Sequence, residues 1–129
     1  MEVRSIVNLT PHALTIHAGD DTVFQIPTSG KVCRCSQENE IVDTINFEFA
    51  FVREKEVTHS KRKKDIHVTR VKLGEVENLP EPEDGKIFVV SRVVAEAVKG
   101  LGRKDIFIPG PAIRDDQGRI IGADGLSII

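Results

Sequence analysis

Short apolar runs rich in valine, isoleucine, threonine and phenylalanine recur along the first 73 residues and are separated by clusters of turn-forming residues. Runs of this length, bounded by Gly, Pro, Asn and Asp, predict β-strands joined by turns. The predicted strands are Val3–Asn8, Leu14–His17, Thr22–Ile26, Val32–Cys35, Ile41–Val52 and Ile66–Leu73. Most of the connections have hairpin length, which favours an antiparallel sheet.

The pattern changes after the apolar strand Lys86–Ser91, where apolar residues begin to recur at helical spacing. Ser91 is a suitable N-cap, and Gly100 or Gly102 a suitable C-cap, so a short amphipathic helix is expected near residues 91–101. Two further strands, Asp105–Ile108 and Arg119–Ile121, are predicted beyond it. The predicted fold class is therefore α+β, mainly antiparallel sheet with one short helix.

With 129 residues, the chain is expected to form a single domain. Its predicted parts are a β-rich segment (1–73), an acidic linker (74–84) and a strand–helix–loop segment (85–129). A net charge of −2 argues against a strongly basic nucleic-acid-binding protein. No secretion signal or membrane-length apolar run is present, so we expect no membrane association and a location in the cytoplasm of the cell that makes the protein.

A basic arm is predicted from Arg53 to Lys72, which holds eight Lys or Arg. Two interpretations stay open: a solvated loop, or an arm that reaches a polyanion or a ligand held by a neighbouring subunit. Just before it, Phe47, Phe49 and Phe51 alternate with polar or small residues and predict an apolar face. A face and arm of this size exceed what a monomer readily covers, so we expect a homo-oligomer.

The sequence gives little support for catalysis or metal binding. Cys33 and Cys35 lie two residues apart, and the four histidines show no paired spacing, so neither a metal site nor a cofactor is expected. No nucleophile elbow, P-loop or zinc-protease motif is present. Asp115-Asp116 has the usual composition of a turn, and an isolated His12 is weak evidence for a base. We expect no enzyme activity.

Binding of an anionic small molecule is better supported. A strand that runs into a helix offers free backbone N–H groups, and arginines from the following loops can hold phosphates in a bidentate manner. An aromatic ring could contact an adenine-like base, although it could equally belong to the core. The candidate ligand-binding residues are Phe88, Ser91, Arg92, Arg103, Arg114 and Arg119.

Several groups of residues also carry a family resemblance. In chain order they are Asn8-Leu-Thr-Pro-His12, Phe88-Val-Val-Ser91, and Arg103-x-Asp105 followed by Pro109-Gly110, Arg114-Asp115, Gly118, Ile120 and Gly122. In this order and spacing they resemble the first Thoeris anti-defence (Tad) family of phage proteins, which sequester nucleotide immune signals. The basic arm matches nothing in that family pattern.

The resemblance implies binding of glycocyclic ADP-ribose, the signal made by bacterial TIR-domain enzymes, without cleavage. It implies an aromatic residue against adenine and arginines on the phosphates, which would fit Phe88 and Arg114 with Arg103 or Arg119. It further implies oligomers of up to six subunits and, for some members, cyclic oligonucleotides bound between subunits. The alternatives are a nucleotide-cleaving phage enzyme that uses His12 or Asp115 as a base, and a structural or interaction protein of the virion.

Overall fold

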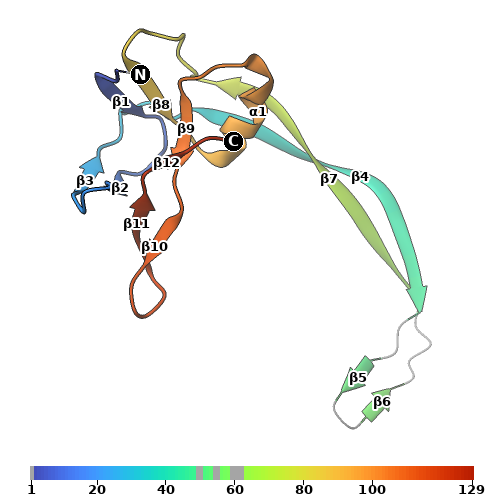
Figure 1. The fold of residues 1–129 in the computed structure, drawn as a ribbon. Helices are drawn as coiled ribbons and strands as arrows, with labels where there is room; N and C mark the ends of the chain where they lie inside the picture. Colours follow the sequence, from blue (N-terminus) through green and yellow to red (C-terminus); the bar gives the residue numbers. More distant parts are fainter. Residues whose placement is uncertain (1, 49–50, 54–55, 59–62) are drawn as a thin grey trace. The chain divides into compact units, whose positions relative to one another are not determined.

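The computed structural model describes residues 2–48, 51–53, 56–58 and 63–129, and its fold is shown in Figure 1. The chain forms two compact units, one made of Met1–Ser36 and Leu73–Ile129 and the other of Gln37–Lys72. The described residues are mostly β-strand with one short α-helix, which confirms the predicted α+β class.

The first sheet of the larger unit has four strands and packs against the only α-helix among the described residues. Its strand order is β1 (Ser5–Asn8), β8 (Lys86–Val89), β9 (Ile106–Pro109) and β12 (Leu126–Ser127). β1, β8 and β9 are mutually parallel, whereas β12 runs antiparallel to β9. The helix α1 (Arg92–Val98) connects β8 to β9, so these elements form a βαβ unit.

The second sheet has the order β10 (Ala112–Arg114), β11 (Ile120–Asp124), β2 (Leu14–His17) and β3 (Val23–Ile26). β2 and β11 are parallel, and the other two pairs are antiparallel. The parallel pairs in both sheets were not predicted, because strands distant in the sequence leave no local signal of their pairing. The short strands β10 and β12 were not predicted either.

The smaller unit contains most of a two-stranded ribbon formed by β4 (Arg34–Glu48) and β7 (Lys63–Glu77). Asn46 Nδ2 donates to Asp65 Oδ1 over 2.8 Å, and Thr44 Oγ1 lies 3.4 Å from His67 Nδ1. These two side-chain contacts indicate an antiparallel pair, because the residue number rises along β4 as it falls along β7. Two short strands, β5 (Phe51–Arg53) and β6 (Glu56–Thr58), lie between β4 and β7 in the sequence and pair with each other in antiparallel orientation.

The ribbon strands differ from the predicted ones. β4 continues through residues 36–40, which separate the predicted strands Val32–Cys35 and Ile41–Val52, and so joins parts of both into one strand. Pairing with β7 overrides the local turn signal in that segment. The predicted phenylalanine face (Phe47, Phe49, Phe51) and most of the basic cluster at residues 61–64 lie outside the described side chains.

The predicted acidic linker is only partly a linker. Residues 74–77 belong to β7, and Leu79 packs against the core. Asn78 Nδ2 donates to the carbonyl of Val32 over 3.1 Å, which attaches this segment to the larger unit.

The helix follows its prediction closely. The Ser91 hydroxyl accepts a hydrogen bond from the backbone N–H of Val94, as expected for an N-cap. A 3₁₀ turn, η1 (Lys99–Leu101), extends the helix and ends at Gly102, which has the left-handed φ of 67° that glycine adopts at little cost. The buried side of the helix is formed by Val94, Ala95 and Val98.

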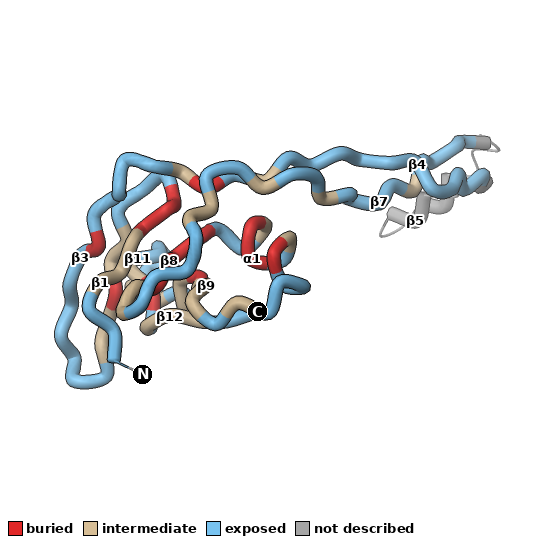
Figure 2. The backbone as a smooth tube through the Cα atoms, turned by 90° about the horizontal axis from the view of Figure 1, so that it is seen from above, coloured by how far each residue is buried: buried red, intermediate tan, exposed pale blue. Residues whose placement is uncertain are grey.

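The main core lies between α1 and the first sheet. Its buried members are Leu9, Cys33, Phe88, Val90, Val94, Ala95 and Ile108. A smaller cluster of Ile16, Ile26 and Ala123 belongs to the second sheet. Figure 2, coloured by residue burial, shows buried residues in β8 and the helix and also in the segment around the end of β1.

A buried polar network explains the Asn8-Leu-Thr-Pro-His12 motif. Asn8 is 1% exposed, and its amide donates to the carbonyls of His12 (2.8 Å) and Ile26 (3.2 Å). Its Oδ1 accepts from the Thr10 N–H (2.9 Å) and the Thr10 hydroxyl (2.6 Å). The motif therefore closes a turn and links it to β3, which is a structural role.

Candidate functional site

The structure places Phe88 in the hydrophobic core. Its side chain is 2% exposed and packs among the core residues of the first sheet. The Arg103 guanidinium carbon lies 5.8 Å from the ring centroid. The ring thus contacts the protein and presents no open face to a ligand in this structure.

Ser91 and Arg92 lie at the start of the helix, but both already have partners. The Ser91 hydroxyl caps the helix, and Arg92 Nε contacts Glu96 Oε1 over 3.3 Å at an exposed position. Because α1 has only seven residues, its N-terminus offers a weak dipole. This end of the helix therefore adds little to an anion site.

Arg103 acts as a clamp beside the helix. Its Nε and Nη2 donate to the two carboxylate oxygens of Asp105 over 2.9 and 2.7 Å, and its Nη1 donates to the Pro80 carbonyl over 2.8 Å. The hydrogen bonds that Arg103 donates to Asp105 raise the pKa of Arg103 above its ordinary value. Most of the donor capacity of Arg103 is used within the protein.

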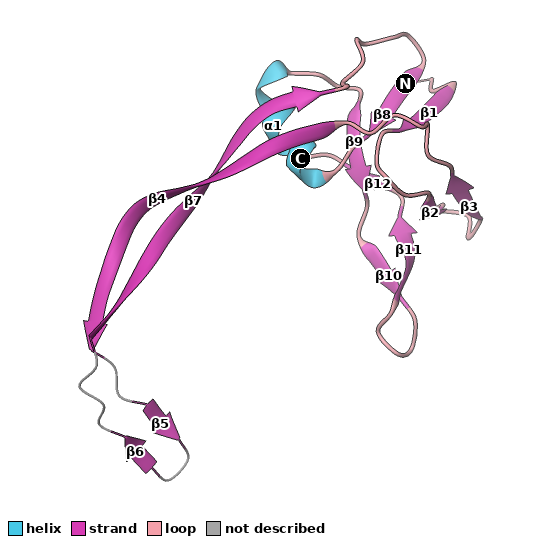
Figure 3. Cartoon of the chain, turned by 180° about the vertical axis from the view of Figure 1, so that it is seen from behind, coloured by secondary structure: helices cyan, strands magenta, loops and turns pink. Residues whose placement is uncertain are grey.

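Arg114 and Arg119 belong to the β10–β11 hairpin, away from the other predicted residues. Arg114 Nη1 donates to the Gly118 carbonyl over 2.8 Å, and Arg119 Nε contacts Asp115 Oδ2 over 3.1 Å. Figures 1 and 3 show the turn of this hairpin projecting away from α1. The structure thus divides the six predicted residues into two groups that lie apart in the fold.

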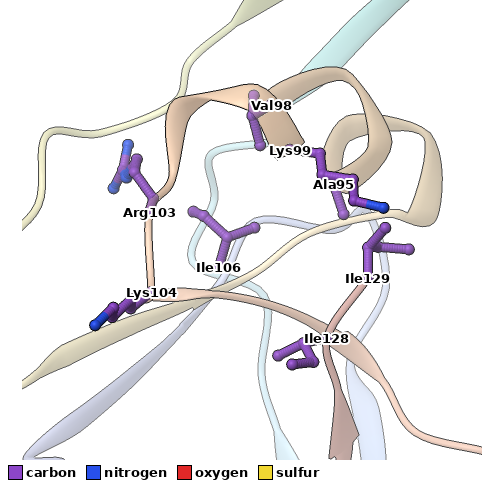
Figure 4. Close-up of a pocket in the computed structure, with 8 residues that line it drawn as sticks. All are labelled: Ala95, Val98, Lys99, Arg103, Lys104, Ile106, Ile128 and Ile129. Atoms are coloured by element: carbon purple, nitrogen blue, oxygen red, sulfur yellow. The ribbon is translucent and has the colours of Figure 1, made fainter.

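A cavity of about 240 Å³ lies beside α1, and Figure 4 shows it in close-up. Its lining combines aliphatic side chains with three cations: Ala95, Val98, Lys99, Arg103, Lys104, Ile106, Ile128 and Ile129. We refer to it as the lysine-rimmed cavity. In Figure 4, Ile106 lies between Lys99 on the helix side and Arg103 with Lys104 on the other.

The charged side chains that line this cavity are all positive. No side chain that lines it carries a carboxylate. Among the residues that the structure describes, neither Lys99 nor Lys104 has a carboxylate oxygen within 4.0 Å, and both residues are exposed. An apolar floor with cations at the rim suits a molecule that has a flat apolar part and a phosphate.

Sequence reasoning found Arg103 but missed Lys99 and Lys104. A usable signal was present, since Lys99-Gly-Leu-Gly-Arg103-Lys104 gathers three cations where a helix ends. Ile128 and Ile129 had no such signal. They reach the cavity because β12 pairs with β9, which places the segment after β12 near the helix.

Of the two residues considered as bases, Asp115 has a carboxylate that accepts several hydrogen bonds, whereas His12 is exposed and contributes its backbone carbonyl to the turn network. Asp115 accepts hydrogen bonds from the N–H groups of Arg119 and Gln117, each over 2.9 Å, and from the Arg119 side chain. These bonds, chiefly that from the Arg119 backbone, lower the pKa of Asp115 below its ordinary value, which makes its carboxylate a weaker base. The His12 carbonyl accepts bonds from Asn8 and Thr10 in the turn network.

The arrangement of possible metal ligands and the state of the two cysteines can be described for the part of the chain that the structure covers. No group of three or more His, Cys, Asp or Glu there has the arrangement of a metal site. Cys33 and Cys35 are free thiols, and burial raises the pKa of Cys33. No helix among the described residues is long and apolar enough to cross a membrane.

Comparisons with family models, with curated proteins and with solved structures found no match for this chain.

Proposed function

We propose that this chain binds glycocyclic ADP-ribose in the lysine-rimmed cavity and sequesters it without cleaving it. In this proposal the chain is a phage anti-defence protein that acts in the host cell cytoplasm. It lowers the free concentration of the signal made by TIR-domain enzymes and so blocks Thoeris signalling. The family resemblance suggests the ligand, and the cavity supports an anionic one.

The observation that carries the proposal is the one-sided charge of the cavity. Lys99, Arg103 and Lys104 border an aliphatic floor, and no Asp or Glu is among its lining residues in the part of the chain that the structure describes. An adenine ring could lie against Ile106 and its neighbours, with the phosphates near the two lysines. A charge-assisted hydrogen bond contributes roughly 1.5–3 kcal/mol, or about ten- to a hundredfold in affinity.

We also propose that the chain assembles into a homo-oligomer. The β4–β7 ribbon exposes large apolar side chains, namely Ile41, Val42, Ile45, Ile66 and Val71. A two-stranded β-unit without an apolar layer against it is only marginally stable in water. Self-association through the ribbon would cover these residues, and cyclic oligonucleotides are a second ligand class to test on the assembly.

Calorimetry with glycocyclic ADP-ribose tests the binding site. The double variant Lys99→Gln/Lys104→Gln should bind at least about tenfold more weakly than the wild type, because each lost cation removes a contact with phosphate. Lys31→Gln is the matched control, since Lys31 is exposed and lines no part of the cavity. Absence of binding by the wild type would overturn the proposal.

The hairpin arginines provide a comparison of sites. If Arg114→Ala weakens binding while the lysine double variant does not, the ligand lies at the β10–β11 hairpin and not in the lysine-rimmed cavity.

The fate of the ligand tests sequestration. It should disappear from the filtrate of a mixture with excess protein and reappear intact after heat unfolding, because binding that stabilises only the ground state does not accelerate a reaction. Accumulation of a product with native protein would favour the enzyme alternative.

A further inference from the structure

The two faces of the β4–β7 ribbon can be assigned from its side-chain contacts. The hydrogen bond between Asn46 and Asp65 places these two side chains on one face. Thr44 and His67, which also lie against each other, belong to the same face, because successive side chains of a strand alternate between the two faces. The opposite face therefore carries Asp43 and Ile45 from β4 and Ile66, Val68 and Arg70 from β7. We refer to it as the Ile45 face.

The apolar part of the Ile45 face lies open to solvent. Ile45 and Ile66 are 50% and 49% exposed, and Val68 is half-buried. β4 and β7 form a sheet of only two strands, and such a unit needs an apolar layer against one face to be stable in water. A partner that covers this face must therefore bring apolar surface of its own.

Two opposite charges accompany these apolar residues. Asp43 lies two residues from Ile45 on β4, and Arg70 lies two residues from Val68 on β7. Both charged residues are exposed, and among the described residues neither has an oppositely charged group within 4.0 Å. The Asp43 carboxylate accepts a hydrogen bond from the Thr44 backbone N–H over 2.8 Å. The Ile45 face thus presents a carboxylate and a guanidinium that a partner can neutralise.

A second copy of the chain meets both requirements. The Ile45 face carries apolar surface together with both signs of charge, so it is complementary to itself, whereas a polyanion would be repelled by Asp43. In a contact related by a twofold axis, every residue pair occurs twice. We infer that two ribbons pack through their Ile45 faces, with Asp43 of each copy paired with Arg70 of the other. This inference rests on the proposed homo-oligomer and identifies its contact face and its charge pairs.

Charge reversal tests this contact, with the mass in solution measured by light scattering. Asp43→Arg and Arg70→Asp should each weaken self-association at least about tenfold, because like charges then face each other in both pairs. An equimolar mixture of the two variants should regain the wild-type mass, since every arginine then meets an aspartate. Thr69→Asp is the matched control: Thr69 is exposed and lies next to Arg70 on the opposite face, so this variant should keep the wild-type mass.

The outcomes separate this inference from the proposed homo-oligomer. If the single variants assemble like the wild type, or if two folded variants stay dissociated in their mixture, the contact between Asp43 and Arg70 is wrong and the homo-oligomer still stands. If the wild type is a monomer at micromolar concentration, the homo-oligomer itself fails and this inference fails with it. The thermal transition of each variant shows whether the variant is folded.

Discussion

Replacing Arg103 with alanine should destabilise the larger unit far more than an arginine replacement at the surface. Arg103 makes two hydrogen bonds to Asp105 and one to the Pro80 carbonyl, and it lies over the Phe88 ring. The side chains of Arg103 and Asp105 are only 13% and 16% exposed, so water cannot fully replace the lost partner. Removing one member of a buried pair costs about 3–5 kcal/mol. Because the pair keeps some exposure, we expect a loss of about 3 kcal/mol, at the lower end of that range.

Urea denaturation and calorimetry measure this loss directly. For a chain of this size, about 3 kcal/mol corresponds to a fall of roughly 10 °C or more in Tm. Arg92→Ala is the control, because Arg92 also pairs with an acidic residue, but their side chains are 72% and 47% exposed. An exposed pair contributes less than about 1 kcal/mol.

A double variant separates the lost contacts from the carboxylate left behind. Arg103→Ala/Asp105→Ala should lose less stability than the sum of the two single variants, because no unpaired carboxylate stays in the structure. If Arg103→Ala costs no more than Arg92→Ala, the clamp behaves as a surface ion pair and the reasoning from its burial is wrong.

Three further predictions concern the turns. Asn8→Ala should lower the free energy of unfolding, measured by urea denaturation, by about 2–3 kcal/mol, because it leaves buried donors and acceptors without partners. A decrease below about 1 kcal/mol would contradict the buried network. Hydrogen bonds from Arg119 lower the pKa of Asp115 below its ordinary value of 3.8. The charged carboxylate therefore stabilises the fold at pH values above 3.8, and this stabilisation is lost as the pH falls through the pKa of the folded state. Asp115→Asn should therefore have a lower Tm than the wild type at pH 7, and this difference should shrink as the pH falls below 3.8. A difference in Tm that stays constant with pH in calorimetry would refute this. Gly110→Ala should lower Tm because a Cβ there would meet the Asp124 carbonyl oxygen, whereas an unchanged Tm would mean that the backbone yields easily.

The lysine-rimmed cavity illustrates a partial prediction. The sequence places Arg103 after a helix and marks it as a candidate anion ligand. It does not show that Asp105 and Pro80 occupy most of its donors, or that Lys99 and Lys104 carry the exposed charge. These properties depend on which segments meet in space.

The local elements of this fold can be predicted from the sequence alone. The helix, its Ser91 cap and its end at Gly102 follow from side-chain spacing and from capping groups a few residues apart. The strands near residues 5–8, 14–17 and 23–26 follow from equally local patterns. Their physical cause lies within each segment, so neighbouring residues are enough to predict them.

The pairing of these elements, and the accessibility of their side chains, depend on contacts between segments that are distant in the sequence. β1 pairs in parallel with β8, some eighty residues later in the chain, and this pairing helps to bury Phe88. A phenylalanine at this position of the sequence is equally consistent with an exposed ring that stacks on a ligand and with a core residue. Burial is a property of the whole packed unit, because it depends on apolar surface contributed by distant segments, and no local pattern records it.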